Sequence, residues 1–383
     1  MIDIFINGII PLTTLGYIIY TLAVTHITIV AITLYLHRGV CHSAIDIHPL
    51  LSHFFRFWLW LTTSMRTADW VAIHRKHHAK VETEHDPHSP AFFGINKVLF
   101  QGADLYHMEK NNKDTIEKYS QNCPTDWVEE KIYTGRNNLG ILILFILNII
   151  LFGTVGIIIW SIQMMWTPIF AAGGINGAGH HWGYRNYNTN DDSTNMSPIG
   201  VIIGGEELHN NHHAYPTAAK FSLRPWEFDI GWMYIKVFGF FGLCKVKRLA
   251  PKPIIQNKQN TDSKLITQSI LQSKLAVITD FTQKVLKPIY TKENFNLSFK
   301  LLADHPNRLS ENQESIVKDL LAKNIKLSTV YSLKNKLHEL LHSREIKHDN
   351  FIQILNKWSE EAKSHGIDAL DDFLVRLRSY KVT

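Results

Sequence analysis

Nine histidines of this 383-residue chain stand in clusters whose internal spacing is fixed. They are His37, His42, His74, His77, His78, His180, His209, His212 and His213. Six of them form the motif H-x-x-H-H twice over, and a neutral imidazole is a common metal ligand. Residues i, i+3 and i+4 of a helix lie on one face, so each motif is predicted to direct three imidazoles at one point.

The other clustered histidines have different spacings. His37 and His42 are five residues apart, an offset that a regular α-helix does not keep on one face. We therefore expect the helix to end or bend between them. Asn176 precedes His180 by about one helical turn, so the amide and the imidazole are predicted to share a face.

The number of clustered histidines argues against several kinds of site. One tetrahedral structural zinc needs about four ligands, whereas two metal ions could share eight or nine imidazoles. Metal-transport sites tend to lie inside membrane spans, and these clusters border apolar segments or lie outside them. Solitary histidines are interpreted as ordinary hydrogen-bonded side chains: His26, His48, His53, His107 and His181.

The setting of the clusters, rather than the ligand type, indicates the metal. Imidazole binds iron, copper, nickel and zinc alike. An apolar environment that can admit a lipid chain, with no hydrolytic nucleophile and no other redox motif, favours two iron ions that share electrons for O2 activation. The three cysteines are single and widely spaced, which argues against an iron–sulfur cluster, a zinc ribbon or a disulfide framework.

Long apolar segments separate the clusters. Residues 4–37 contain no Asp, Glu, Lys or Arg, and a single membrane span needs about 20 residues. The segment is predicted to be one long tilted helix with an apolar lead-in, or a tight hairpin of two short spans. A second uncharged stretch, residues 137–180, suits two antiparallel spans that turn near Gly153 and Gly156.

Two further apolar segments carry charges in their middle. Residues 50–70 include Arg56 and Arg66, and residues 228–244 include Lys236. A charge at the centre of a bilayer is costly. Both segments are therefore predicted to be helices at the membrane interface.

The distribution of charge predicts the orientation in the membrane. Nearly all charged side chains lie in residues 38–136 and after residue 180, so both blocks are placed on one side. The positive-inside rule makes that side the cytoplasm. No charged n-region precedes the first apolar stretch, so a removable signal peptide is not expected.

The composition of the chain changes at Pro251. Residues 1–251 hold 19 basic and 19 acidic side chains, whereas residues 252–383 hold 21 and 15, so the whole net charge of +6 lies in the tail. We predict a membrane domain over 1–251 and a C-terminal helical extension over 252–383, with Gln256–Ser263 as a linker. Apolar residues at threes and fours predict helices in the extension, and Ser310 with Gln313 resembles a capping box.

The histidine clusters lie in motifs that resemble those of the integral-membrane fatty acid desaturases, specifically the acyl-CoA delta-9 desaturase type. The motifs are HRGVCH at 37–42, HRKHH at 74–78, HDPHSP at 85–90, NGAGHHWG at 176–183 and GGEELHNNHHAYP at 204–216. They occur in the family's order, with its hydrophobic segments between them, over about residues 10–250.

The resemblance implies an all-α membrane protein with a transmembrane helical stem and a cytosolic helical cap that holds a di-iron centre. It implies that the nine clustered histidines are the iron ligands, that Asn176 holds an iron-bound water, and that Trp70 lines the acyl tunnel. The family uses O2 and two supplied electrons to remove two hydrogens from adjacent methylenes, which gives a cis double bond. No catalytic side chain beyond the metal ligands is expected.

The chain departs from the family in two places. Animal members have Arg-Asp immediately before the second histidine box, in contact with the coenzyme A head group, whereas this chain has Ala72 and Ile73. Acyl-CoA is the expected carrier, with acyl carrier protein or a phospholipid left open. The N-terminal apolar region is also shorter, which allows three spans instead of four and would place the N-terminus outside.

The electrons are expected to come from a separate protein. The chain has no His-Pro-Gly-Gly haem motif and no GxGxxG nucleotide fingerprint. The predicted partner is a ferredoxin, a rubredoxin or a cytochrome b5-like donor with its reductase. Lys245, Lys247 and Arg248 could meet an acidic donor or anchor the chain at the cytoplasmic face. Nucleic acid is not an expected partner.

The sequence thus predicts a fatty acyl desaturase, with delta-9 the expected position, in a multi-pass protein of the bacterial cytoplasmic membrane. Two alternatives stay open. One is a di-iron lipid hydroxylase, because the same oxidant could return oxygen to the substrate radical, and the other is a histidine-rich metal-handling membrane protein. The role of the extension is open among donor docking, membrane-surface binding and support of the cap.

Overall fold

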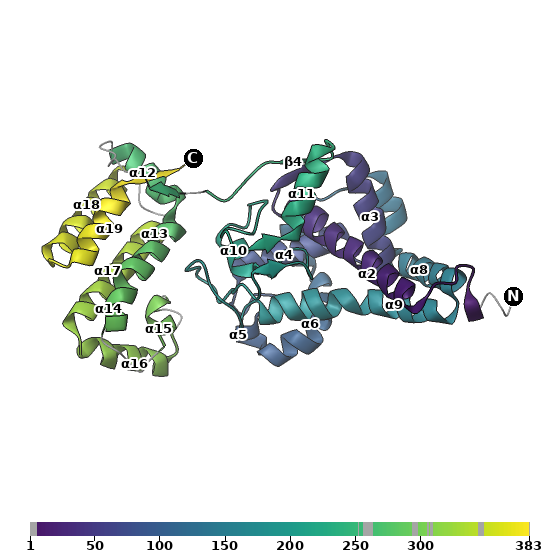
Figure 1. The fold of residues 1–383 in the computed structure, drawn as a ribbon, viewed down its shortest axis with the longest axis horizontal. Helices are drawn as coiled ribbons and strands as arrows, with labels where there is room; N and C mark the ends of the chain where they lie inside the picture. Colours follow the sequence, from purple (N-terminus) through teal and green to yellow (C-terminus); the bar gives the residue numbers. More distant parts are fainter. Residues whose placement is uncertain are drawn as a thin grey trace. The chain divides into compact units, whose positions relative to one another are not determined.

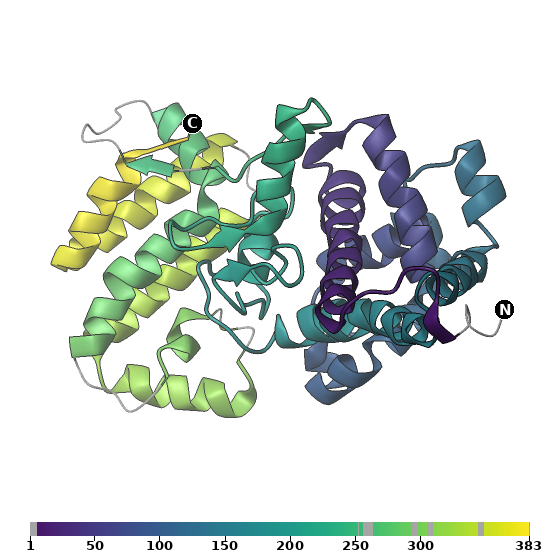
Figure 2. The same cartoon turned by 45° about the vertical axis from the view of Figure 1, so that its right-hand side comes forward.

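The computed structural model describes residues 6–251, 253–255, 263–292, 298–304, 306, 309–343 and 348–382. They are mainly helical and form two compact units, one with residues 1–185 and 191–250 and the other with residues 186–190 and 251–383 (Figures 1 and 2). We call these the N-terminal unit and the C-terminal unit. Residues 256–262 of the expected linker lie outside the described residues.

The N-terminal unit consists of helices and two pairs of very short strands. Its helices, with η marking a π-helix, are α2 (Thr14–Ala31), η1 (Ile32–Cys41), α3 (Pro49–Thr63), α4 (Thr67–Lys80), α5 (Pro90–Phe93), α6 (Ile95–Lys110), α7 (Lys113–Tyr119), η2 (Glu129–Tyr133), α8 (Asn137–Phe152), α9 (Thr154–Trp166), η3 (Thr167–Ala178), α10 (His209–Ala214) and α11 (Ile230–Phe240). Strand β1 (Ile45–Ile47) pairs antiparallel with β4 (Cys244–Val246), and β2 (Ile199–Gly200) pairs parallel with β3 (Phe228–Asp229).

The first apolar segment is one long helix rather than a hairpin. Helices α2 and η1 are continuous from Thr14 to Cys41, and the Thr13 hydroxyl accepts a hydrogen bond from the backbone N–H of Gly16 at the start. This helix and the one over Thr154–Ala178 are each long and apolar enough to cross a membrane. Helices α8 and α11 are apolar but shorter, so length and composition single out two candidate spans among the described residues.

The predicted turn near Gly153 and Gly156 is confirmed. Gly153 lies between α8 and α9 with a φ of 60°, a conformation that glycine adopts without strain. Gly156 lies so close to the carbonyl of Asn148 that any side chain on it would overlap α8. The missing side chain therefore lets the two helices pack tightly after the turn.

The charged segment over residues 50–70 forms two helices, and its Arg56 side chain is buried inside the protein. Ser64, with a φ of 60°, separates α3 from α4. Arg56 on α3 is buried, and it donates hydrogen bonds to Asp126 at 2.6 Å and to Glu129 at 3.0 Å. Its charge is thus neutralised within the protein, so it gives no reason to place the helix at the interface. The interfacial position of this segment and of α11 stays a prediction.

The C-terminal unit is a separate helical bundle with one small strand pair. Its helices are α12 (Ser263–Gln272), α13 (Lys274–Phe281), η4 (Thr282–Leu286), α14 (Lys287–Lys292), α15 (Lys300–Ala303), α16 (Glu311–Ala322), α17 (Ile325–His342), α18 (His348–Ser364) and α19 (Asp368–Arg378). Strands β5 (Pro253–Ile255) and β6 (Tyr380–Val382) pair antiparallel. The helical character expected from the apolar spacing is confirmed.

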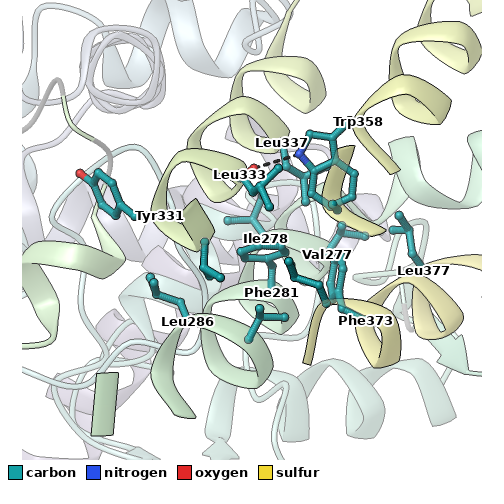
Figure 3. Close-up of a cluster of buried hydrophobic side chains, with 14 of the residues drawn as sticks. Val277, Ile278, Phe281, Leu286, Tyr331, Leu333, Leu337, Trp358, Phe373 and Leu377 are labelled. Atoms are coloured by element: carbon teal, nitrogen blue, oxygen red, sulfur yellow. Dashed lines mark hydrogen bonds between the residues drawn. The ribbon is translucent and has the colours of Figure 1, made fainter. Parts of the chain in front are cut away.

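The core of the C-terminal unit is apolar and well filled. Phe281, Leu337 and Phe373 are completely buried in it, and the indole N–H of Trp358 donates to the Leu333 carbonyl at 3.0 Å (Figure 3). The predicted capping box is confirmed at the start of α16, where Ser310 and Gln313 exchange hydrogen bonds between side chain and backbone. The unit therefore has its own hydrophobic core and its own helix-terminus signals.

Candidate metal centre

The structure brings the nine clustered histidines together in two groups. Within each group, one ring nitrogen from every residue lies within 4.8 Å of all the others. The first group is His37, His42, His74, His78 and His212. The second group is His77, His180, His209 and His213. Residues up to 175 positions apart in the chain thus converge.

His37 lies on the π-helix η1, and His42 is the C-cap residue that immediately follows this helix. As expected from the sequence, the helix ends between them, at Cys41. The N–H of His42 donates to the carbonyl of His37 at 3.0 Å, which is the i to i+5 bond of a π-helix. Because this helix is wider than an α-helix, residues five apart lie on one face.

Each H-x-x-H-H motif divides its imidazoles between the two groups. On α4, His74 and His78 belong to the first group and His77 to the second. On α10 the division is reversed, with only His212 in the first group. The expectation that each motif converges on one point is therefore wrong. Adjacent helical residues point about 100° apart, so the second and third histidines of a motif diverge.

The nitrogen atoms of the first group lie at hydrogen-bonding distance from one another. The Nε2 atom of His212 lies 3.1 Å from that of His37 and 2.9 Å from that of His78. The Nε2 atoms of His78 and His74 are 3.0 Å apart, and those of His74 and His42 are 3.2 Å apart. In the second group, the Nε2 atoms of His209 and His180 are 3.0 Å apart.

These separations fit nitrogen ligands around metal ions. A neutral imidazole carries one N–H, and His37, which donates from Nδ1 to Glu206, presents a lone pair at Nε2. Lone pairs that converge repel one another unless a cation lies among them. Two imidazoles about 90° apart on a metal, with bonds of about 2.1 Å, would have nitrogens about 3.0 Å apart.

Four carboxylates hold the outward nitrogens of the histidine rings. Glu206 accepts from His37 at 2.7 Å, and Asp86 accepts from His77 at 3.0 Å. Asp191 accepts from His213 at 3.0 Å and Glu82 from His180 at 3.3 Å. In every case the contact is to Nδ1, which leaves Nε2 for a metal. Sequence reasoning missed these residues, although Glu206 and Asp86 lie inside motifs that it singled out.

Burial keeps most of these imidazoles neutral and therefore able to bind a metal. Burial, together with the neighbouring imidazoles, holds the pKa of His74, His78 and His212 well below the usual value for histidine. His77 is the exception: burial lowers its pKa, but the charge of Asp86 raises it overall. Burial also raises the pKa of Glu206 to about 8.

The buried Arg38 joins the first and the last histidine motif. It is completely buried beside His37, and its guanidinium donates to Asp229 at 3.0 Å and to the Gly204 carbonyl at 3.3 Å. The same group lies over the ring of Phe221 at 3.9 Å. An arginine that lost these partners would be an uncompensated buried charge, so the contact fixes η1 against the segment before α10.

A cavity of about 450 Å³ opens beside the first histidine group. Trp70 and Asn176, both chosen from the sequence, line it together with His37 and His74. The ring of Trp70 stacks on that of His74 with centroids 4.9 Å apart. Most of the remaining lining is apolar, so the cavity could hold a hydrocarbon chain next to the imidazoles.

His88 is a further polar residue of this cavity that the sequence reasoning did not choose. It is buried, its ring stacks on His77 with centroids 4.4 Å apart, and it lines the cavity. Its Nε2 atom has no hydrogen-bond partner among the residues that the structure describes. The signal available was the second histidine of the HDPHSP motif. By contrast, His26 bonds the Tyr234 hydroxyl at 2.9 Å, as expected of a solitary histidine.

Comparison with known proteins gives two family matches. The model of the fatty acid desaturase family matches residues 12–227, and one described as a transposase matches residues 263–383. The second match covers less than half of the chain. Among the described residues of the C-terminal unit, no group of three or more His, Cys, Asp or Glu side chains lies close enough together to hold a metal ion.

Several curated proteins are similar to about 60% of this chain. The sn-1 stearoyl-lipid 9-desaturase of Synechocystis sp. is 33% identical over 233 residues, which are 60% of this chain and 70% of that protein. Delta-9 acyl-lipid desaturase 1 of Arabidopsis thaliana is 28% identical over 239 residues, 61% of this chain and 74% of that protein. The icosanoyl-CoA 5-desaturase of Limnanthes douglasii is 30% identical over 246 residues, 62% and 65% respectively.

Proposed function

Because the chain belongs to the fatty acid desaturase family, we propose that it introduces a cis double bond, at carbon 9, into a long fatty acyl chain. The observation that carries the proposal is the convergence of nine imidazoles in two groups beside an apolar cavity. The nine histidines would hold two iron ions, five on one and four on the other. When bound, the irons supply the capacity to activate O2 with two electrons.

The residues of the chain would prepare the reaction in three ways. The carboxylates of Glu206, Asp86, Asp191 and Glu82 orient the imidazoles through Nδ1, so the ligands are in place before the metal binds. The cavity would hold the acyl chain and exclude water from the reacting methylenes. Trp70, stacked on His74, would form part of the cavity wall against which the acyl chain lies. Asn176 would hold a water on one of the irons.

A membrane lipid is the carrier that the cavity favours. Ala72 and Ile73 occupy the places where animal acyl-CoA enzymes have Arg-Asp, and both are buried. Ile73 lines the cavity, so an apolar side chain stands where a charged head group would need a partner. Two of the relatives named above act on acyl lipids and one on an acyl-CoA. We therefore place a glycerolipid before the acyl-CoA that the sequence analysis favoured.

Electrons would come from a separate ferredoxin, rubredoxin or cytochrome b5-like protein with its reductase. The same proposal places the chain in the bacterial cytoplasmic membrane as a multi-pass protein, with a helical stem in the bilayer and the histidines in a cap on the cytoplasmic side. The two candidate spans support it, because η1 and η3, which end them, both contribute residues to the cavity.

Fatty acid analysis of a bacterial host that expresses the chain tests this function. Gas chromatography with mass spectrometry should find a new cis double bond at carbon 9 in the esterified fatty acids of the membrane. A host that expresses His78→Ala at the same level is the matched control and should lack the product. A fatty acid that gains 16 mass units would instead identify a hydroxylase, and an unchanged profile with an active electron donor would contradict the proposal.

A pulse of labelled saturated acyl chains separates the possible carriers. If the carrier is a glycerolipid, label that is already esterified in phospholipid should become unsaturated after acyl-CoA synthesis has been blocked. Unsaturation that stops with the block would assign the reaction to acyl-CoA or acyl carrier protein instead.

A further inference from the structure

The cavity beside the first histidine group has two ends that differ in charge. Glu206, the one Asp or Glu among the described residues that line it, lies at the metal-centre end and is hydrogen-bonded to His37. Lys110, the one Lys or Arg among the same lining residues, lies in the last turn of α6. Tyr106, one helical turn earlier, and His107 line the cavity as well. We call Tyr106, His107 and Lys110 the α6 end of the cavity.

The packing of α6 against η3 separates the α6 end from the metal centre. A side chain on Gly102 would overlap the carbonyl of Ala172, and one on Gly177 would meet the side chain of Leu99. Residue numbers thus rise along α6 while they fall along η3, so the two helices are antiparallel. Lys110, which follows Gly102 by two turns, therefore lies away from the end of η3 that reaches the histidines.

The distance between the two ends suits an acyl chain. Tyr106 follows Gly102 by four residues on α6, and Asn176 follows Ala172 by four residues on η3, in the opposite direction. With a rise of about 1.5 Å per residue, Tyr106 and Asn176 are roughly 12 Å apart along the helices. An extended acyl chain covers a similar length from its ester to carbon 9. A chain whose ester lies beside Tyr106 therefore brings carbon 9 to the metal centre.

The side chains of Tyr106 and Lys110 are free to bind a ligand. The hydroxyl of Tyr106 is buried and has no hydrogen-bond partner among the residues that the structure describes. Within the same described part of the chain, the ammonium of Lys110 forms no ion pair or hydrogen bond. The adjacent carboxylate of Glu109 is bound to Lys76 at 2.7 Å. A buried hydroxyl without a partner is costly, so a ligand that accepts a hydrogen bond from it is favoured.

The surface around the α6 end is apolar. Met108 on α6 is exposed, and so are Met165 and Ile169 on the facing helix. Pro168, next to Ile169, is exposed and lines the cavity. Exposed apolar side chains are more favourable in contact with lipid than with water. We therefore expect the occupant to enter from the bilayer and to meet one cation, Lys110, as it does so.

We infer that the α6 end binds the polar part of the substrate and that the substrate is an anionic glycerophospholipid. The Tyr106 hydroxyl donates to the carbonyl of the acyl ester, and the Lys110 ammonium binds the phosphate. The two residues are four apart on one helix, so their side chains lie on the same face. A diacylglycerol or a neutral glycolipid offers the ester without the phosphate. The inference rests on the proposed function, which places an acyl lipid in this cavity.

Lipid binding by the purified full-length protein tests the site. The iron-loaded protein is kept without O2 and without an electron donor, so that binding is measured in the absence of turnover. Native mass spectrometry in detergent micelles gives the dissociation constants of distearoylphosphatidylglycerol, distearoylglycerol and stearoyl-CoA. The phospholipid should bind about 10-fold more tightly than the diacylglycerol, because a hydrogen bond to a charged group adds to its affinity. It should also bind more tightly than stearoyl-CoA.

Substitutions at the α6 end separate the two contacts. Lys110→Ala should weaken binding of the phospholipid about 10-fold and leave binding of the diacylglycerol unchanged, whereas Lys110→Arg, which keeps the charge, should bind like the wild type. Tyr106→Phe removes the hydroxyl and keeps the ring, so it should weaken both lipids equally, by about 3- to 10-fold.

The matched control is Lys97→Ala on the same helix. Lys97 is exposed and is not among the residues that line the cavity, so its loss should change neither dissociation constant. Circular dichroism of every variant verifies that it is folded.

The outcomes separate this inference from the proposed function. Wild-type affinity for the phospholipid in folded Lys110→Ala or Tyr106→Phe overturns the inference. An effect of Lys110→Ala on stearoyl-CoA alone also overturns it, because the phosphate would then belong to coenzyme A. Desaturation in the expressing host without any preference for the phospholipid overturns the inference and leaves the proposed function intact. Binding that depends on Lys110, together with an unchanged fatty acid profile, supports the site and contradicts the proposed function.

Discussion

Both units have buried apolar clusters, but they differ in the polar side chains that they bury. The N-terminal unit places nine imidazoles and four carboxylates at its centre. The C-terminal unit buries Phe281, Leu337 and Phe373, and among its described residues Lys334 is the one buried side chain of the Lys, Arg, Asp and Glu types. Lys334 lies against three backbone carbonyls, those of residues 302, 303 and 304.

The difference shows what each interior is for. Buried apolar surface stabilises a fold directly, by about 25 cal/mol for each Å² removed from water. Buried polar groups destabilise a fold unless partners satisfy them. The buried histidines and carboxylates of the N-terminal unit are therefore explained by a ligand-binding role. The stability of this unit should depend on metal, whereas the C-terminal unit should be stable without metal.

The largest effect is expected from the loss of a metal-ligating imidazole. His212→Ala should lower desaturation by more than about 100-fold, because even the outer partners of ligands affect activity by about 10- to 100-fold. The thermal transition of the C-terminal unit should stay where it is. Fatty acid analysis and calorimetry of the same preparation measure the two effects. Full activity in this variant would remove His212 from the ligand set.

The reverse experiment removes a large apolar side chain from the other interior. Phe281→Ala should lower the free energy of unfolding of the C-terminal unit by about 3–5 kcal/mol, because it leaves a cavity in a fully packed core. Hydrogen exchange of peptides from α13 and α17 in increasing denaturant measures the change. Iron content should be normal wherever the unit is still folded. A loss of iron from the folded variant would show that iron binding depends on the core of the C-terminal unit, which contradicts the separation of the two interiors.

Removal of the metal should act on the N-terminal unit alone. At a free metal concentration about 100-fold above the dissociation constant, binding stabilises the folded unit by about 2.7 kcal/mol, which chelation would remove. Hydrogen exchange in α4 and α10 should increase on chelation, and exchange in α17 should not. Equal changes in both units would show that their stabilities are not separate.

A smaller effect is expected from an outer carboxylate. Glu206→Gln keeps the shape of the side chain but weakens the contact with His37, so the affinity of the first group for iron should fall by about 10- to 100-fold. Titration with iron(II) measures it. Glu109→Gln, a change at a carboxylate that bonds Lys76 rather than a clustered histidine, is the control and should bind iron normally.

The smallest effect is expected at a helix terminus of the C-terminal unit. Ser310→Ala removes the capping box of α16 and should cost about 1 kcal/mol in the stability of this unit. Iron content and activity should not change. Chemical denaturation measures the cost, and a change in activity without a change in stability would contradict the assignment of Ser310 as a cap.

The sequence was sufficient wherever the signal is local or the motif is specific. The two H-x-x-H-H motifs and the other clustered histidines identify the family, and the structure brings all nine together. The turn at Gly153 and the capping box at Ser310 are also correct, because each depends on a few neighbouring residues. The change of composition at Pro251 is visible in the sequence, whereas the grouping of Asn186–Asn190 with the C-terminal unit comes from the structure alone.

Tertiary structure decided how the histidines are shared and what surrounds them. The division into groups of five and four depends on the directions of α4 and α10, and the alignment of His37 with His42 depends on a π-helix that no spacing rule in the sequence signals. Glu206 meets His37 across 169 positions, and Asn190 meets His338 across 148. Such contacts arise only when the chain has folded, because sequence patterns report the faces of single elements and not which faces meet.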